Sequence, residues 1–97
     1  MFDFDKAVKA YLLAFKEGPS DKTRIDACLD PQYAYEYAYS VDKCPRDDTR
    51  KAACEESFWA YLHAKNIDGC VRDDTIKAAS KTPCFARLYK LNVDRKS

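Results

Sequence analysis

The sequence lacks the features that mark several classes of protein. It has no run approaching the ~18 apolar residues of a membrane span, no Cys-x-x-Cys pair and a single histidine. Basic and acidic residues nearly balance, at 17 and 16, which excludes the cationic excess of many nucleic-acid-binding proteins and the heavy negative charge of a DNA mimic. We therefore predict no metal site, no cofactor and no membrane association. Glycine (2) and proline (4) are few while 46% of the residues are hydrophobic, so a folded domain is expected.

The first residues and the cysteines indicate a cytoplasmic protein. Residues 1–5 lack the basic start and apolar stretch of a signal peptide. Five cysteines, an odd number, fit reduced thiols better than a secreted disulfide framework. Disulfides remain the alternative, because Cys44 and Cys54 have a spacing found in helical hairpins and Cys28 and Cys44 repeat the spacing of Cys54 and Cys70.

The sequence contains a tandem repeat of 26 residues. Sliding the chain against itself by that length brings residues 34–59 onto residues 60–85 with 12 identities. Periods of ~20–50 residues are typical of stacked arrays. An older copy covers residues 8–33, and a partial copy, residues 86–97, closes the chain. We interpret residues 1–97 as one helical-repeat domain made of these four units.

Each unit is predicted to hold a short helix A and a longer helix B. Helix A covers residues 49–55 in the second unit, where Asp47 and Asp48 would cap its N-terminus and complement its dipole. Helix B starts after a break such as Asp30-Pro31 and covers residues 31–41 in the first unit. We expect four B helices joined by three A helices.

One face of each helix B carries an aromatic residue and an alanine per turn. No unit can bury this face alone, so successive units are expected to stack around a continuous core. The predicted fold class is therefore all-α, a short α-solenoid of helix pairs. The predicted core positions are Ala7, Val8, Tyr11, Leu12, Phe15, Tyr33, Ala34, Tyr37, Ala38, Val41, Trp59, Ala60, His63, Ala64, Ile67, Phe85, Ala86, Tyr89 and Val93.

Residues 30–38 read Asp-Pro-Gln-Tyr-Ala-Tyr-Glu-Tyr-Ala and are followed by Val41. This pattern resembles a tandem helical repeat, of the DPxYAYxYAxxV type, met in phage and bacterial proteins of unknown function, and the likeness covers most of the chain. The tryptophan-proline turn usual in those repeats is replaced here by Cys44-Pro45 and by Cys70-Val71. The resemblance implies a phage or phage-associated origin and transfers no activity.

Three tyrosines are the main candidates for a binding site. Tyr35, Tyr39 and Tyr61 lie on helix B but off its core face, so we expect them to be exposed together. Exposed tyrosines are enriched in interface hot spots. The alternative is that their rings pack against helix A of the neighbouring unit. Arg46 and Arg72 complete the candidate binding set.

His63 is the main candidate for chemistry. It takes the place of Tyr37 and Tyr89 in the repeat, which predicts an aromatic at the edge of the core rather than a catalytic base. The sequence shows no recognisable arrangement of a nucleophile and an orienting carboxylate around it. We therefore predict no catalytic residue and no enzyme.

The favoured function is a non-catalytic module that binds another protein. If the phage resemblance holds, the specific version is an inhibitor of a host defence or regulatory protein that acts in the host cytosol. One alternative is a nucleic-acid-associated factor that uses Arg46, Arg50, Arg72 and the basic C-terminus along one edge. Another is a small enzyme that uses His63 or a cysteine. A homodimer is also predicted, because both ends of a short stack expose an apolar face unless they are capped.

Overall fold

The computed structural model describes residues 3–93, and the only regular secondary structure among them is helical. The predicted all-α class is confirmed with seven α-helices in this range, although two of the expected longer helices have seven residues, as the short ones do, and exceed them only with the π-helical turns that continue them. The longer helices are α1 (Phe4–Glu17), α3 (Pro31–Tyr37), α5 (Ser57–His63) and α7 (Pro83–Asn92). The short helices are α2 (Asp21–Ala27), α4 (Asp47–Ala53) and α6 (Asp73–Ala79). Two π-helical turns, η1 (Ala38–Asp42) and η2 (Ala64–Asp68), lengthen α3 and α5.

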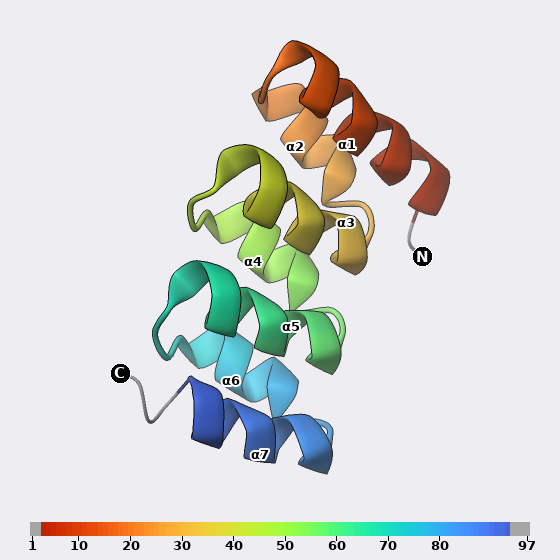
Figure 1. Ribbon diagram of the computed structural model, residues 1–97. Coiled ribbons are helices and arrows are strands. Elements are labelled where there is room, and N and C mark those ends of the chain that lie inside the picture. Colours follow the sequence, from red (N-terminus) through yellow and green to blue (C-terminus); the bar gives the residue numbers. More distant parts are fainter. Residues whose placement is uncertain (1–2, 94–97) are drawn as a thin grey trace.

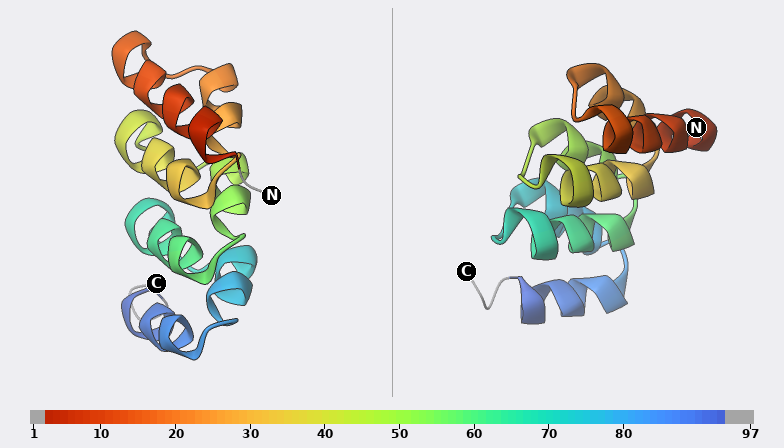
Figure 2. Two further views of the ribbon diagram at one scale, coloured as in Figure 1. Left: turned by 90° about the vertical axis from the view of Figure 1, so that its right-hand side faces the viewer. Right: turned by 45° about the horizontal axis from the view of Figure 1, so that its top comes forward.

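The helices lie in two columns that follow the order of the sequence. One column holds α1, α3, α5 and α7, and the other holds α2, α4 and α6 (Figures 1 and 2). The molecule measures 37 × 26 × 16 Å, and α1 and α7 lie at opposite ends of its long dimension. None of the helices described is long and apolar enough to cross a membrane.

The starts of the longer helices follow the sequence signals. Asp30 precedes α3 and its carboxylate accepts hydrogen bonds from the backbone N–H groups of Gln32 (3.1 Å) and Tyr33 (3.3 Å), while Pro31 occupies the first helical turn. The short helix α4 differs from its prediction, because it begins at Asp47 rather than at residue 49. Its N-cap is Arg46, without a side-chain cap, so Asp47 and Asp48 lie in the first turn and complement the helix dipole from there.

The π-helical ends of α3 and α5 were not predicted. At each end the backbone N–H of the C-cap residue donates to a carbonyl five residues earlier, Lys43 to Ala38 and Gly69 to Ala64, both at 2.9 Å. The C-cap backbone is left-handed in both, with φ of 56° at Lys43 and 66° at Gly69. A glycine adopts this conformation without the steric cost that a lysine meets.

Lys43→Gly should therefore stabilise the fold. Relief of the left-handed strain exceeds the entropy that glycine adds to the unfolded chain, so we expect the free energy of unfolding to rise by about 0.5 kcal/mol. The matched variant Gly69→Ala should lower it by about 1 kcal/mol, through backbone strain alone, because no atom lies within 4 Å of the added Cβ. Urea denaturation of both variants measures the two shifts. If both variants change the free energy of unfolding in the same direction, the assignment of left-handed strain to Lys43 is contradicted.

The core follows the predicted face in α3, α5 and α7. Its fully or nearly fully buried members are Ala34, Tyr37, Ala38, Ala60, His63, Ala64, Tyr89 and Val93. The remaining predicted residues of these three helices, Tyr33, Val41, Trp59, Ile67, Phe85 and Ala86, are half-buried.

The predicted core face of α1 is wrong at two positions, whereas Ala7 is buried as predicted and Val8 and Tyr11 are half-buried. Leu12 and Phe15 are 58% and 57% exposed, and the buried residues are Ala7, Ala10 and Ala14. The first copy has no π-helical turn, and α1 reaches the loop before α2 through Gly18 (φ 92°) instead. The loss of that turn shifts the register of α1 relative to α3, so the 26-residue alignment assigns its faces incorrectly.

Candidate functional site

A buried polar contact joins each short helix to the longer helix that follows it. The Tyr37 hydroxyl lies 2.6 Å from Thr23 Oγ1 between α2 and α3, and the Tyr89 hydroxyl lies 2.8 Å from Thr75 Oγ1 between α6 and α7. Tyr37 also donates to the carbonyl of Ser20 at 3.2 Å. These contacts satisfy tyrosine hydroxyls that would otherwise be buried without a partner.

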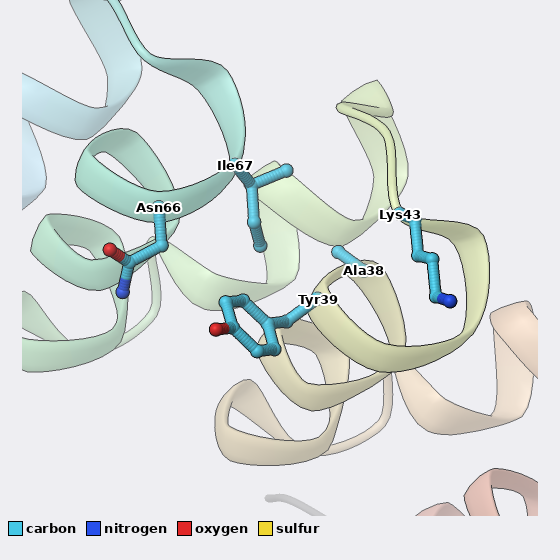
Figure 3. A pocket seen from close by; sticks show the side chains of 5 residues that line it. All are labelled: Ala38, Tyr39, Lys43, Asn66 and Ile67. Carbon is cyan, nitrogen blue, oxygen red and sulfur yellow. The ribbon is translucent and has the colours of Figure 1, made fainter.

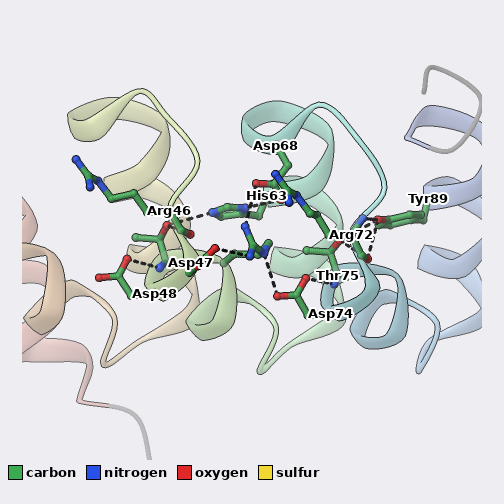
Figure 4. Close-up of polar contacts among 11 residues, drawn as sticks. Arg46, Asp47, Asp48, His63, Asp68, Arg72, Asp74, Thr75 and Tyr89 are labelled. Carbon is green, nitrogen blue, oxygen red and sulfur yellow. Dashed lines mark hydrogen bonds and ion pairs between the residues drawn. The ribbon is translucent and has the colours of Figure 1, made fainter.

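His63 makes the equivalent contact between α4 and α5. Its Nε2 lies 3.2 Å from Thr49 Oγ1, and its Nδ1 lies 3.1 Å from Asp68 Oδ2 (Figure 4). The side chains of His63 and Asp68 are both fully buried. The second carboxylate oxygen of Asp68 is 3.8 Å from Arg50 Nη1, close enough for charge attraction but without a hydrogen bond. Both nitrogens of the imidazole therefore have partners inside the protein.

Thr49, His63 and Asp68 form a series of hydroxyl, imidazole and carboxylate. The same order of groups activates nucleophiles in hydrolases. Here Thr49 is fully buried, and its hydroxyl also donates to the Arg46 carbonyl at 3.2 Å. The burial of His63 confirms its prediction as a core residue, and the series acts as an internal polar support.

Sequence reasoning missed Thr49 and Asp68 as partners of His63. A signal for Thr49 existed, because a threonine precedes each of Tyr37, His63 and Tyr89 by 14 residues. No comparable signal pointed to Asp68. It lies at the end of η2, and the π-helical turn that places its carboxylate against the imidazole was not predicted.

Ion pairs run along the column of short helices. Arg24 Nε donates to Asp48 Oδ2 at 2.7 Å between α2 and α4, and this hydrogen bond raises the pKa of Arg24 above its ordinary value. Arg50 Nε donates to Asp74 Oδ2 at 2.9 Å between α4 and α6. Arg50 is only 9% exposed, so its guanidinium is occupied by carboxylates and is poorly placed to contact phosphates.

The predicted exposure of three tyrosines is wrong for two of them. Tyr35 and Tyr61 are 7% and 5% exposed, and burial raises the pKa of Tyr35. Their hydroxyls accept hydrogen bonds at 2.9 Å from the side-chain amides of Asn66 and Asn92. Only Tyr39, at 54%, is exposed.

The rings of the two buried tyrosines pack within the column of longer helices. Tyr35 contacts Trp59 with ring centroids 5.6 Å apart, and Tyr61 contacts Phe85 at 6.2 Å. The predicted alternative, packing against helix A, does not describe these ring contacts. Each tyrosine and its asparagine link one longer helix to the next.

The exposed Tyr39 lies beside a shallow hollow between η1 and η2. The hollow has a volume of about 140 Å3 and is lined by Ala38, Tyr39, Lys43, Asn66 and Ile67 (Figure 3). Tyr39 stacks on Tyr35 with centroids 5.8 Å apart, which holds its ring against the buried column. The hollow joins an aromatic ring, an aliphatic side chain, an amide and an ammonium group on one surface.

Arg46 and Arg72 are exposed but lie outside this hollow. Arg46 Nε lies 3.3 Å from Asp42 Oδ2, and burial raises the pKa of Asp42 above its ordinary value although Arg46 opposes the shift. The backbone of Arg72 holds the Tyr89 hydroxyl, with its N–H donating at 3.1 Å. Of the five predicted binding residues, only Tyr39 lines the hollow.

No match was found among protein-family models, among curated proteins or among solved structures. The phage-repeat resemblance therefore stays a prediction.

The cysteines are unreactive at neutral pH where they are buried, and the acidic groups form no metal site in the part of the chain described. All five cysteines are free thiols, and burial raises the pKa of Cys28 and of Cys54 to about 12, so both stay protonated at neutral pH. Within residues 3–93 no group of three or more histidine, cysteine, aspartate and glutamate side chains is arranged to hold a metal ion.

Proposed function

We propose that the chain is a short α-solenoid of helix pairs and that it acts as a non-catalytic protein-binding module. The stacking is supported by contacts that recur one copy apart. Arg24 with Asp48 is followed by Arg50 with Asp74, and the Tyr35 contact with Asn66 is followed by Tyr61 with Asn92. Stacked helix pairs present extended surfaces suited to protein partners.

The exposed ring of Tyr39 carries the proposal of binding. The ring is large and rigid, and its stack on Tyr35 already holds it in place. The Tyr39 side chain therefore loses little conformational entropy when a partner covers it. Ile67 supplies apolar area nearby, and Lys43 and Asn66 supply polar groups at the edge. The hollow is too small to enclose a drug-sized ligand, which favours a side chain of a protein partner as its occupant.

The two alternatives lack comparable support. A nucleic-acid factor would need Arg50, which is buried and engaged with Asp74 and Asp47. An enzyme based on His63 would need solvent access to Thr49, which is fully buried. The phage resemblance adds a narrower version of the proposal, an inhibitor of a host defence or regulatory protein acting in the host cytosol. A homodimer stays a prediction that light scattering at two concentrations tests.

Tyr39→Ala should weaken partner binding strongly while leaving the fold intact. We expect a loss of affinity of at least tenfold, since truncation of an aromatic hot spot costs about 2 kcal/mol or more. The wild type, Tyr39→Ala and the control Lys51→Ala, an exposed residue on α4, are immobilised in parallel and incubated with extract of the native host. Mass spectrometry identifies the protein retained in stoichiometric yield.

The comparison of the three immobilised proteins, each on its own affinity column, decides the proposal. A partner retained by the wild type and by Lys51→Ala, and lost with Tyr39→Ala, supports it. Equal retention on all three columns contradicts the role of Tyr39. Retention of DNA or RNA that falls steeply with salt concentration would instead favour the nucleic-acid alternative.

A further inference from the structure

The short helices α2 and α4 occupy equivalent inner positions. Each contacts the next longer helix through a threonine and the next short helix through an arginine. For α2 these contacts are Thr23 with Tyr37 and Arg24 with Asp48. An inner position is therefore formed by one face of a longer helix and one face of the short helix that follows it.

Within residues 3–93, no short helix covers the equivalent faces of α1 and α2. The two helices form a groove of about 170 Å3 on the side of α1 opposite to the Tyr11 contact with Tyr33, and we call it the N-terminal groove. Its apolar floor is made by Ala10 and Leu13. Leu13 is 42% exposed there.

The register of α1 identifies the groove with an inner position. Ala10 and Ala14 are buried as Ala34 and Ala38 are, which gives an offset of 24 residues (34 minus 10). Ring contacts agree with this offset. Tyr11 contacts Phe15, four residues later, and Tyr33 of α3. Tyr35 likewise contacts Tyr39, four residues later, and Trp59 of α5. Leu13 then takes the place of Tyr37 (37 minus 24).

The charges of the groove are changed relative to the inner positions. Lys22 takes the place of Asp48 (48 minus 26), so an ammonium group stands where an inner short helix meets a carboxylate. Lys6 and Lys9 also line the groove, and its single carboxylate, Asp26, lies 4.0 Å from Lys6 Nζ and 3.6 Å from Lys22 Nζ. Three ammonium groups against one carboxylate leave the groove positively charged.

We propose that the N-terminal groove binds a short acidic amphipathic helix of another protein. Its occupant carries a carboxylate where α2 and α4 carry an arginine, so that it pairs with Lys22. It carries an apolar side chain in place of the threonine, because Leu13 offers no hydroxyl. The proposal rests on the proposed stacking of helix pairs and is independent of Tyr39.

A second copy of the chain is a poor occupant. At the opposite end of the molecule α7 presents the exposed side chains of Arg87 and Lys90. Contact between this end and the groove brings like charges together, which disfavours the complex. An acidic segment of a different protein meets no such repulsion.

The test is an NMR titration of the full-length, isotope-labelled protein with a designed peptide. The peptide has the sequence of residues 46–57, which includes α4, with Thr49→Leu, Arg50→Glu and Cys54→Ser. A control peptide keeps Arg50 and is otherwise identical. We expect saturable shift changes confined to α1 and α2 with the acidic peptide, and binding at least tenfold weaker to the Lys22→Asp protein, whose exposed position 22 leaves the fold unaffected.

The charge exchange provides the matched control. The Arg50 peptide should bind Lys22→Asp at least tenfold more tightly than it binds the wild type, because this pair restores the inner arginine–aspartate contact. Tyr39→Ala should leave peptide binding unchanged, which separates this proposal from the role of Tyr39. The proposal is overturned if the NMR shifts show no saturation up to about 1 mM peptide, which corresponds to a binding free energy of about 4 kcal/mol. It is also overturned if the affinity of the peptide does not depend on the residue at position 22. Concentration-dependent shifts of the protein alone at α1 and α2 would assign the groove to a second copy and overturn it as well.

Discussion

Replacing His63 with alanine should lower the free energy of unfolding by about 3 to 4 kcal/mol. The substitution leaves a cavity at a fully buried position and removes the partner of Thr49. It also leaves the buried carboxylate of Asp68 with only the distant guanidinium of Arg50, at 3.8 Å. A domain of this size has only about 5 to 10 kcal/mol of total stability, so urea denaturation will show a large shift of the midpoint.

The matched control is His63→Tyr. Tyrosine occupies the same place in Tyr37 and Tyr89, where its hydroxyl meets a threonine. We expect this variant to lose only about 1 to 2 kcal/mol, less than His63→Ala, because the threonine contact is kept and no cavity is left, although Asp68 loses its imidazole partner and a larger ring must fit. If alanine and tyrosine destabilise the protein equally, the polar support assigned to His63 is not what position 63 contributes.

Arg50→Ala should destabilise the protein by about 2 to 3 kcal/mol. The guanidinium is 9% exposed, donates to Asp74 at 2.9 Å and to Asp47 at 2.6 Å, and is the nearest cation to Asp68. Removing one partner of a largely buried ion pair leaves the remaining carboxylates without compensation. Thermal and urea unfolding of the variant measure the loss.

A double-mutant cycle separates the pair from its surroundings. If the Arg50 contact with Asp74 couples α4 to α6, Arg50→Ala and Asp74→Ala together should cost less than the sum of the single changes. Strict additivity of the two alanine changes would show that the ion pair itself contributes little.

The starts of α3 and α7 were predictable because their causes are local, whereas α4 begins two residues before its predicted start. Asp30-Pro31 and Thr82-Pro83 combine a capping residue with a proline in the first turn, and α3 and α7 begin at these prolines. The period of buried residues in α3, such as Ala34 and Ala38, likewise follows from the geometry of a single helix. These features need no knowledge of what lies beside the helix.

The fate of the tyrosines could not be predicted in the same way. Tyr35 and Tyr39 lie on the same side of one helix, but an asparagine 31 residues away from Tyr35 buries its hydroxyl while Tyr39 meets solvent. The helical pattern of a sequence indicates which face of the helix is apolar. It does not indicate which residue will cover the hydroxyl of a tyrosine side chain. The pairing of Asp68 with His63 depends in addition on the π-helical turn η2.

The register of α1 failed for a related reason. Identity over Pro19, Thr23 and Arg24 aligned the first copy correctly across α2, and the same alignment was extended back through α1. Without a π-helical turn, α1 reaches its C-cap one residue earlier, and the loop to the next short helix is also one residue shorter, so Leu12 becomes exposed while Ala14 is buried. One altered turn therefore rotates a whole helix relative to a sequence alignment that is correct on its other side.

Contacts such as Arg24 with Asp48 and Tyr35 with Asn66 have a consequence for how the gene can change in length. Every such pair takes one member from one copy and the other member from the next. In-frame deletion of residues 34–59 would place Arg24 opposite Asp74, whereas duplication of residues 34–59 would keep the arginine–aspartate contact but place Ser40 rather than an asparagine opposite Tyr35. A change in length by 26 codons within residues 34–59 therefore preserves the arginine–aspartate contact between short helices, whereas a change that is not a multiple of 26 codons would separate the arginine from its carboxylate.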